Sequence, residues 1–392
     1  MEALLETSGK GARESSATND LKTHVLIIGA GPYGIAVAHE LWQRGIDFLI
    51  VGEPFALWLD HTLDSMRLRT GTRLSEVYSP NACHSLARFV AKSPCGEELE
   101  AGASRIPIET FRGYLRQVLE HSPFTVLRQK VTLLEACGGH YHARCSQGLE
   151  IEAQSVVLAT GAGPHRYLPM ALNRLPLHRT LHSWEARRIA NLRHQRVLVI
   201  GDGQSAAEIV AHLRSSNRVC WSLRRRPVFC RTPLGLPKPL FELLLQVPNT
   251  LFRLPRGVRR RLFKGLCRTT MTPDCSEIYA DDRVEKVWGD AEALGLRESA
   301  GKIVGTAGVH FDYVVAATGY QASLAGLSFL ASDLLRSLWG NSRLDHDFQS
   351  SVPDLFMVGI LAEATFGPSM RLIHGSRFTA QRLGAALTRR YS

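Results

Sequence analysis

The chain has 392 residues and a net charge of +11, with 45% hydrophobic and 21% charged residues. This composition excludes a disordered or fibrous protein, and no apolar run approaches the ~20 residues that span a bilayer. Arginine clusters without interleaved aromatic residues indicate small anionic ligands, with nucleic-acid binding as a minor alternative. Residues 1–21 are small and polar, so we expect a disordered leader without a signal peptide and a cytoplasmic protein.

The first ordered segment predicts a strand, a glycine turn, a helix and a second strand. Val25–Ile28 and Phe48–Val51 are continuous apolar runs, as in strands buried on both faces of a parallel sheet. Between them, G-x-G-x-x-G opens a helical pattern that carries a proline in its first turn. The second strand ends at an acid, which accepts hydrogen bonds from ribose hydroxyls. The order predicts a dinucleotide site made by Gly29, Gly31, Pro32, Gly34 and Glu53.

Periodicity fades between residues 54 and 91. We expect this segment to fold over the first dinucleotide, with Trp58 among its apolar anchors and a turn at Asn81. An amphipathic helix is predicted from Phe111 to near His121.

Short alternating runs follow at 125–134, 140–145 and 149–152. They predict an antiparallel meander inserted into the first domain. Ser155–Gly161 then reads as a buried strand that returns to the parallel sheet. It closes on Thr160-Gly161, which places this turn near the cofactor.

A second glycine motif follows the predicted strand Val197–Ile200. It has alanine at the last glycine position, which close packing tolerates. The next strand, Val219–Leu223, ends in three arginines. Arginine there suits the 2′-phosphate of NADPH, which a carboxylate would repel; arginines that merely face solvent are the alternative. The residues of this predicted NADPH site are Gly201, Gly203, Gln204, Ser205, Arg224, Arg225 and Arg226.

Residues 229–275 interrupt the second domain with proline-rich, hydrophobic and basic stretches. Helices are predicted at Leu240–Val247 and Arg256–Leu266. This insertion could line a substrate pocket, form a dimer contact or touch a membrane surface, and a plain helical subdomain is the alternative.

The sequence Ala-Thr-Gly recurs at the end of a second buried strand, at Thr318-Gly319. A final strand is predicted from Pro353 to Gly359. A long helix is then predicted from Pro368 to Leu387, and its N-terminus would favour negative charge near the strand ends.

The eight cysteines include no C-x-x-C pair, so we expect reduced thiols. Cys137 and Cys145 bracket His140 and His142. Their spacing fits no standard zinc pattern, and alternate histidines lie on one face of a strand. We therefore expect no metal site.

The motifs GAGPYG and GDGQSAAE, the strands VVAATGY and VPDLFMVG and the closing FGP helix resemble two-dinucleotide-binding-domain flavoproteins. More narrowly, they are similar to class B flavoprotein monooxygenases: flavin-containing monooxygenases, ornithine and lysine N-hydroxylases, and Baeyer–Villiger enzymes. The resemblance spans the chain from about His24 to Leu387.

This resemblance implies an α/β fold with two Rossmann-like domains, the second inserted into the first. The FAD-binding domain would comprise residues 22–170 and 326–392, and the NADPH-binding domain residues 171–325. FAD would occupy the first glycine site and NADPH the second, with Thr160-Gly161 and Thr318-Gly319 near the domain crossover. Gly359 would lie beneath the isoalloxazine ring.

The implied activity is an NADPH- and O2-dependent FAD monooxygenase. It would oxygenate a small nucleophilic substrate, by N-hydroxylation of an amine or by S-oxygenation, through a C4a-hydroperoxyflavin. Arg371 and Asn81 are the candidate catalytic residues, with a surface arginine and a turn asparagine as the simpler interpretations. Homo-oligomerisation is left open.

Two other functions stay open. Pro176 and His178 stand where the monooxygenase signature has Phe and Gly. An NADPH-dependent flavoprotein reductase with a quinone or protein acceptor is therefore the main alternative. The third is a non-catalytic redox or nucleotide sensor with an anionic partner.

Overall fold

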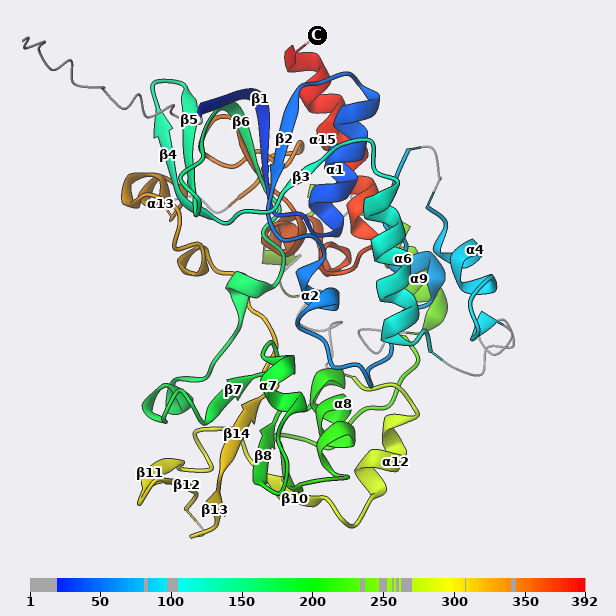
Figure 1. Cartoon of the computed structure of the whole chain (residues 1–392), viewed down its shortest axis with the longest axis vertical. Coiled ribbons are helices and arrows are strands. Elements are labelled where there is room, and N and C mark those ends of the chain that lie inside the picture. The colour runs from blue at the N-terminus through cyan, green and yellow to red at the C-terminus, as the bar shows by residue number, and fades with distance from the viewer. Residues whose placement is uncertain are drawn as a thin grey trace, which may run out of the picture.

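The computed structural model describes residues 20–80, 84–96, 105–232, 237–246, 252–255, 257–258, 261, 270–306, 308–339 and 343–391. Two sheets with parallel cores organise the chain, and Figure 1 shows the first in the upper half of the molecule and the second in the lower half. The predicted α/β class with two Rossmann-like units is confirmed.

The first sheet has seven strands, in the order β3-β2-β1-β6-β5-β4, with β15 also paired to β6. They are β1 (Asp20–Ile28), β2 (Phe48–Val51), β3 (Val126–Leu127), β4 (Val131–Cys137), β5 (His140–Cys145), β6 (Glu150–Leu158) and β15 (Leu355–Met357). Ile28 is in register with Val51 on one side and with Leu158 on the other. Three strands therefore end at one level, and the turns that follow them meet at one edge of the sheet.

The second sheet is wholly parallel, in the order β10-β9-β8-β14-β7. Its strands are β7 (Thr180–His182), β8 (Arg196–Ile200), β9 (Arg218–Leu223), β10 (Glu285–Trp288) and β14 (Tyr313–Ala316). All five come between β6 and β15 in the chain, so the second sheet is an insertion into the first. A small antiparallel sheet adds β11 (Arg297–Ser299), β12 (Lys302–Val304) and β13 (His310–Phe311).

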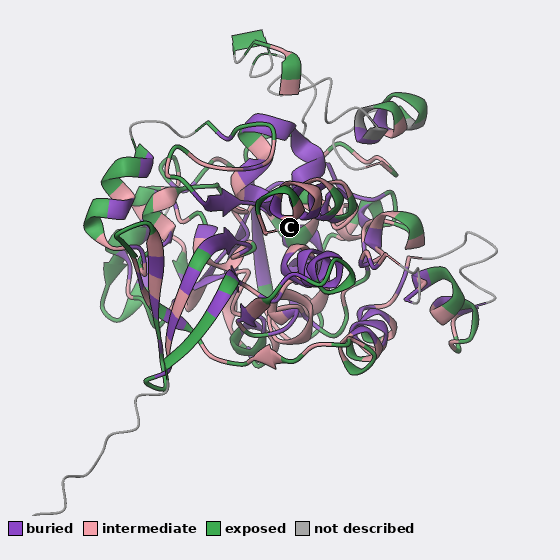
Figure 2. Cartoon of the chain, turned by 90° about the horizontal axis from the view of Figure 1, so that it is seen from above, coloured by how far each residue is buried: buried purple, intermediate pink, exposed green. Residues whose placement is uncertain are grey.

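Helices cover both sheets, and Figure 2 shows their buried sides facing the centre of the molecule. On the first sheet, α1 (Pro32–Gln43) packs along α15 (Gly375–Tyr391), and α6 (Ile108–Glu120) lies nearby. On the second, α8 (Gln204–Leu213) contacts α7 (Ala186–Ala190) and α12 (Cys275–Ala280). The remaining helices are α2 (Ala56–Leu59), α3 (Thr72–Ser75), α4 (Leu86–Ala91), α9 (Lys238–Gln246), α13 (Ser332–Trp339) and α14 (Glu363–Phe366).

The closing helix starts later than predicted. Pro368–Arg371 forms a short 3-10 turn, and Leu372 is extended, with φ −97° and ψ 151°. The hydroxyl oxygen of Tyr33 lies 2.8 Å from the carbonyl oxygen of Met370 and 3.0 Å from that of Leu372. These carbonyls therefore accept from a side chain instead of continuing a helical ladder. The prediction of one helix from Pro368 is wrong at its start, because α15 begins at Gly375.

Other predicted boundaries differ less. The expected strands at 149–152 and 155–161 are one continuous strand, β6, whose first half pairs with β5 and whose second half pairs with β15. The expected leader lies outside the described residues, except that Asp20 and Leu21 already belong to β1. Most of the helix predicted at Arg256–Leu266 also lies outside them.

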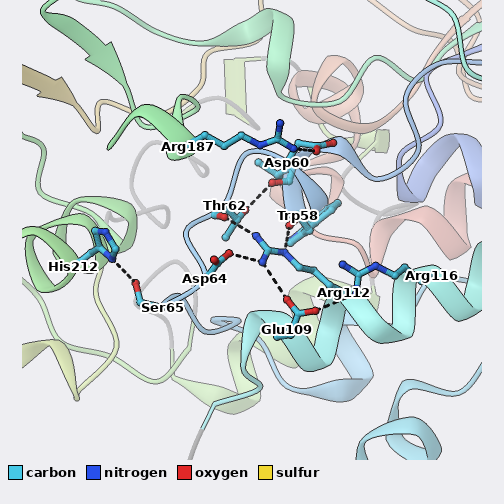
Figure 3. A network of polar contacts seen from close by, with 11 residues as sticks. Trp58, Asp60, Thr62, Asp64, Ser65, Glu109, Arg112, Arg116, Arg187 and His212 are labelled. Carbon is cyan, nitrogen blue, oxygen red and sulfur yellow. Dashed lines mark hydrogen bonds and ion pairs between the residues drawn. The ribbon is translucent and has the colours of Figure 1, made fainter. Parts of the chain in front are cut away.

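A polar network joins the two halves of the molecule (Figure 3). Arg112 on α6 is buried, and its guanidinium donates to the carbonyl oxygens of Trp58 and Thr62 and to Asp64, at 2.6–2.8 Å. The segment held in this way reaches the second domain at both ends. Asp60 pairs with Arg187 of α7 at 2.5 Å, and Ser65 lies 3.2 Å from His212 of α8.

Candidate nucleotide-binding sites

The first glycine turn lies where β1 ends, between the ends of β2 and β6. Gly29 has a φ of +113°, and a Cβ on it would lie 2.2 Å from the carbonyl oxygen of Ala159. A Cβ on Gly34 would lie 1.9 Å from the carbonyl oxygen of Gly29. Both positions therefore need glycine for close packing of the turn itself. Gly31 is different, because a Cβ there meets nothing within 4 Å.

The open space at Gly31 faces the start of α1, where Pro32 occupies the first turn. Backbone N–H groups at such a helix start bind phosphates. Beside it, Gly161 has a φ of +65° and open space around its Cβ position, and the buried Oγ1 of Thr160 has no hydrogen-bond partner. An unpartnered buried hydroxyl is costly unless a ligand satisfies it. These residues fit a bound dinucleotide.

Glu53 follows Gly52, which packs against the first glycine turn, and Trp58 lies on α2 further along the chain. The Glu53 carboxylate is half-exposed and lies 3.6 Å from a guanidinium nitrogen of Arg128, so it remains available to ribose hydroxyls. Trp58 packs its ring edge-on against Phe111, with the ring centroids 5.7 Å apart. The tryptophan is thus fixed from α6 and by its own carbonyl bond to Arg112.

The chain's last segment packs against Tyr33 of the first glycine motif. Gly359 has a φ of +65°, and a Cβ on it would lie 3.4 Å from the ring of Tyr33. A Cβ on Gly375 would lie 2.4 Å from the Tyr33 hydroxyl. Tyr33, inside the first glycine motif, therefore anchors this segment, a role that the glycine pattern does not indicate.

The second glycine turn repeats the first in backbone geometry. Gly201 has a φ of +151°, and a Cβ on it would lie 2.4 Å from the carbonyl oxygen of Ala317, in the second Ala-Thr-Gly sequence. Gly203 caps α8, and Ser205 is exposed at the helix start. The side chain of Gln204 is bonded to other protein groups: it donates to Glu208 at 2.8 Å and accepts from the Thr272 backbone N–H at 2.8 Å.

Two of the three arginines after β9, Arg224 and Arg225, pair with an acid. Nη2 of Arg224 donates to Oδ1 of Asp202 at 3.0 Å, and Nε of Arg225 lies 3.3 Å from Oδ2. The hydrogen bond to Asp202 raises the pKa of Arg224. Asp202 is buried between Gly201 and Gly203. Sequence reasoning missed it, because it occupies a variable position of the motif; its charge was the available signal.

The second crossover turn, Thr318-Gly319, packs on the segment that follows the first. The Thr318 hydroxyl donates to the carbonyl oxygen of Tyr167, and the Gly319 carbonyl accepts from the Tyr167 N–H at 3.0 Å. That same carbonyl lies 3.2 Å from Nε2 of His182, whose pKa is lowered by burial. Gly319 has a φ of +81° with open space at its Cβ position, as Gly161 has.

The two candidate catalytic residues stay predictions. Arg371 ends the short 3-10 turn, where its Nε pairs with Glu363 at 2.6 Å and its Nη1 lies 3.3 Å from the Tyr320 carbonyl oxygen. Arg371 therefore links the last segment of the chain to the segment that follows β14. Asn81 lies outside the described residues.

Neither a metal cluster nor a membrane span is evident in the part of the chain that the structure describes. No group of three or more His, Cys, Asp or Glu side chains there could hold a metal ion. None of the described helices is both long enough and apolar enough to cross a membrane. The six cysteines within the described ranges are free thiols.

One known protein family matches about half of the chain. The family model described as "Pyridine nucleotide-disulphide oxidoreductase" matches residues 26–233, just over half of the sequence. That range begins in β1 and ends after β9, so it includes both glycine turns and the arginines.

Two curated relatives illustrate the range of similarity. Ferredoxin–NADP reductase of Thermus thermophilus is 25% identical over 214 residues, covering 53% of this chain and 54% of the relative. Indole-3-pyruvate monooxygenase YUCCA8 of Oryza sativa subsp. indica is 27% identical over 214 residues, covering 53% of this chain and 49% of the relative. The chain thus spans about half the length of the curated relatives it matches.

Solved structures match over nearly the whole chain. Ornithine hydroxylase from Pseudomonas aeruginosa has a TM-score of 0.75 at 18% identity, covering 95% of this chain and 100% of the other. Bacillithiol disulfide reductase from Staphylococcus aureus has a TM-score of 0.63 at 15% identity, with the same coverage. The fold is therefore shared with flavoprotein monooxygenases and with a reductase.

Proposed function

The chain belongs to the pyridine nucleotide-disulphide oxidoreductase family, and from that premise we propose that it is an NADPH- and O2-dependent FAD monooxygenase. One observation carries the proposal: a glycine turn lies at the ends of the parallel strands in each of the two sheets, with an acid beside the first turn and arginines beside the second. An acid suits the ribose of FAD, and arginines suit the 2′-phosphate of NADPH.

In this proposal, FAD is held by Gly29, Gly31, Gly34, Glu53 and Thr160, and NADPH by Gly201, Gly203, Arg224 and Arg225. When bound, FAD would supply the redox and oxygen chemistry, with NADPH as the source of electrons. The protein binds and orients both cofactors. Closure by the last segment, anchored at Tyr33, keeps water from the flavin end of the first site.

The proposed substrate is a small nucleophile, either an amine or a sulfide. The fold shared with ornithine hydroxylase supports an amine, and the similarity to the indole-3-pyruvate monooxygenase YUCCA8 supports oxygen transfer in general. Arg371 is proposed to lie near the substrate, since it links the closing segment to the crossover strand.

A reductase is the second candidate, and the similarity to ferredoxin–NADP reductase favours it. A disulfide substrate relay fits poorly. Burial raises the pKa of Cys220 to about 12 and raises the pKa values of Cys145 and Cys275. Such thiols are poor sources of the reactive thiolate. A quinone or protein acceptor would need no protein thiol.

Stopped-flow absorbance separates the two candidates. FAD-loaded protein is reduced anaerobically with NADPH and then mixed with oxygenated buffer. A monooxygenase should show a long-lived oxygenated-flavin band whose decay is accelerated by certain amines or sulfides. Direct return to oxidised flavin, with peroxide release and rapid quinone reduction, would favour the reductase. Protein that binds no flavin would contradict both.

The arginines offer a separate test of the second site. Arg224→Gln with Arg225→Gln should weaken NADPH binding by about tenfold or more, because it removes the charge that pairs with the 2′-phosphate. NADH binding and flavin content should change little. Equal losses for NADPH and NADH would show that these arginines do not contact the 2′-phosphate.

A further inference from the structure

Asp202 occupies an unusual place for an acid. It lies between the two glycines of the second turn, directly after β8, with a side chain that is only 5% exposed. Each of its oxygens faces a different arginine, Arg224 at 3.0 Å and Arg225 at 3.3 Å. The side chains of the two arginines are 60% and 54% exposed. A buried carboxylate thus lies beneath two arginines that face solvent.

The two oxygens of Asp202 are not equally satisfied. Oδ1 accepts a hydrogen bond from Arg224. Oδ2 is buried and makes no hydrogen bond; its contact with Arg225 is an ion pair only. A buried acceptor without a donor is destabilising, so this oxygen is suited to a ligand that brings a donor, such as a hydroxyl group.

Charge at the site follows from these contacts. Arg224, Arg225 and Asp202 together carry a net charge of about +1, where the arginines alone would carry about +2. Asp290 and Tyr167 are the other ionisable groups that act on Arg224. Arg226 is exposed at the edge of the site. The attraction for a doubly charged phosphate is therefore smaller than three consecutive arginines suggest.

NADPH and NADH differ only at the adenosine ribose, where one has a 2′-phosphate and the other a 2′-hydroxyl. The phosphate pairs with arginine but is repelled by a carboxylate. The hydroxyl, in contrast, donates to a carboxylate. In most such sites the acid or the arginine follows the second strand of the βαβ unit, which here is β9. In this chain an arginine follows β9, and an acid follows the first strand, β8.

We propose that Asp202 is a specificity-determining residue that narrows the preference for NADPH and allows the second site to accept NADH as well. Its carboxylate accepts the ribose 2′-hydroxyl of NADH. With NADPH, Arg224 and Arg225 turn from the carboxylate toward the 2′-phosphate. This inference rests on the proposed second nucleotide site, but not on oxygen transfer.

Titration calorimetry on FAD-loaded protein tests the proposal without catalysis, because the first site is then filled. The two ligands are 2′,5′-ADP, which carries the phosphate of NADPH, and ADP, which has the free 2′-hydroxyl of NADH. We expect the wild-type protein to bind both, with affinities within about tenfold of each other.

Asp202→Asn keeps the shape of the side chain and removes its charge. We expect about tenfold tighter binding of 2′,5′-ADP and severalfold weaker binding of ADP. Asp202→Ser, a smaller variant, should act in the same direction. The matched control is Asp290→Asn, which removes the same charge near Arg224 without a contact to it; we expect less than a twofold change.

Several outcomes would overturn the inference. Weaker binding of 2′,5′-ADP to both Asp202 variants, with unchanged melting, would show that Asp202 holds the arginines in place for phosphate. An unchanged ratio of the two affinities would show no role in selection, and an equal effect of Asp290→Asn would indicate general electrostatics. Failure of wild-type protein to bind either ligand would remove the nucleotide site and with it the proposed function. Loss of oxygen transfer alone would leave the inference standing.

Discussion

The two glycine turns solve the same steric problem and differ in charge. Gly29 and Gly201 both have positive φ values, and each lies against the carbonyl of an alanine in an Ala-Thr-Gly sequence on the neighbouring strand. Beyond the turns, an exposed acid flanks the first site, whereas Asp202 and two arginines flank the second. Backbone geometry thus makes a site for a dinucleotide, and the charges beside it determine which dinucleotide binds.

The largest effect should come from breaking the shared backbone geometry at the first site. Gly29→Ala forces a Cβ to 2.2 Å from the Ala159 carbonyl oxygen, in a backbone conformation that costs a further ~1–3 kcal/mol. We expect loss of bound FAD, read from flavin absorbance, and a clear drop in melting temperature.

Gly31→Ala is the matched control, because its Cβ meets nothing within 4 Å. Its melting temperature without cofactor should be nearly that of wild type, while its FAD affinity falls at least about tenfold, since the backbone can no longer approach the pyrophosphate. Full flavin binding by Gly29→Ala would contradict the packing argument.

The next largest difference between the two turns is expected at the last position of the motif, which is Gly34 in the first and Ala206 in the second. Gly34→Ala places a Cβ 1.9 Å from the Gly29 carbonyl oxygen, so we expect a loss of at least about 2 kcal/mol in the free energy of unfolding. Ala206 holds the corresponding place in the second turn and is buried without needing to be glycine. Ala206→Gly should cost only about 1 kcal/mol, the helix propensity difference. Urea unfolding of both variants measures this contrast; equal losses would contradict it.

Acid should destabilise the domain that holds the first site. His39 on α1 is buried beside His84 and Phe124, with its Nε2 3.3 Å from Ser122 Oγ. Burial, and then the charge of His84, lower its pKa to about 4. The unfolded chain, with a histidine pKa near 6.5, binds the proton more readily. Stability therefore falls as the pH drops from about 6.5 toward 4, by about 2 kcal/mol at pH 5.

Urea unfolding at pH 8, 6 and 5 checks the sign and the size of this loss. His39→Gln should reduce the pH dependence, whereas His212→Gln on α8, the corresponding helix of the second site, should leave it unchanged. A wild-type protein equally stable at pH 5 and pH 8 would show that His39 is not held neutral by the fold.

The smallest effect is expected at the acid of the first site. Glu53 is half-exposed and 3.6 Å from Arg128, so Glu53→Gln should change stability by less than about 0.5 kcal/mol. FAD affinity should fall severalfold through the lost ribose contact. Ultrafiltration of the holoprotein against buffer measures the flavin released. Wild-type retention of FAD would show that the carboxylate does not contact the ribose.

The sequence predicted the periodic elements well. Phe48–Val51 was expected as a strand and is β2, and the helix expected after Pro32 is α1. Apolar runs and glycine spacing are local signals, and both depend on contacts within one βαβ unit. The first glycine turn could be predicted from them.

Long-range contacts could not be predicted in the same way. The start of α15 depends on the hydroxyl of Tyr33, which donates to the carbonyl oxygen of Met370, 337 residues away in the chain. The two residues meet only in the folded protein. Asp202 and the arginines after β9 meet through the pairing of β8 with β9, which a single strand pattern does not reveal. Side chains that serve a site from variable motif positions leave no periodic signal.

Tyr33 also bears on how the chain folds during synthesis. All strands of the second sheet lie between Thr180 and Ala316, so that unit is complete once this stretch has left the ribosome. The first sheet still lacks β15, and Tyr33 lacks its partners Met370 and Leu372. Although N-terminal units generally fold first, here the first sheet can be completed only after the second, once residues 355–372 have been synthesised.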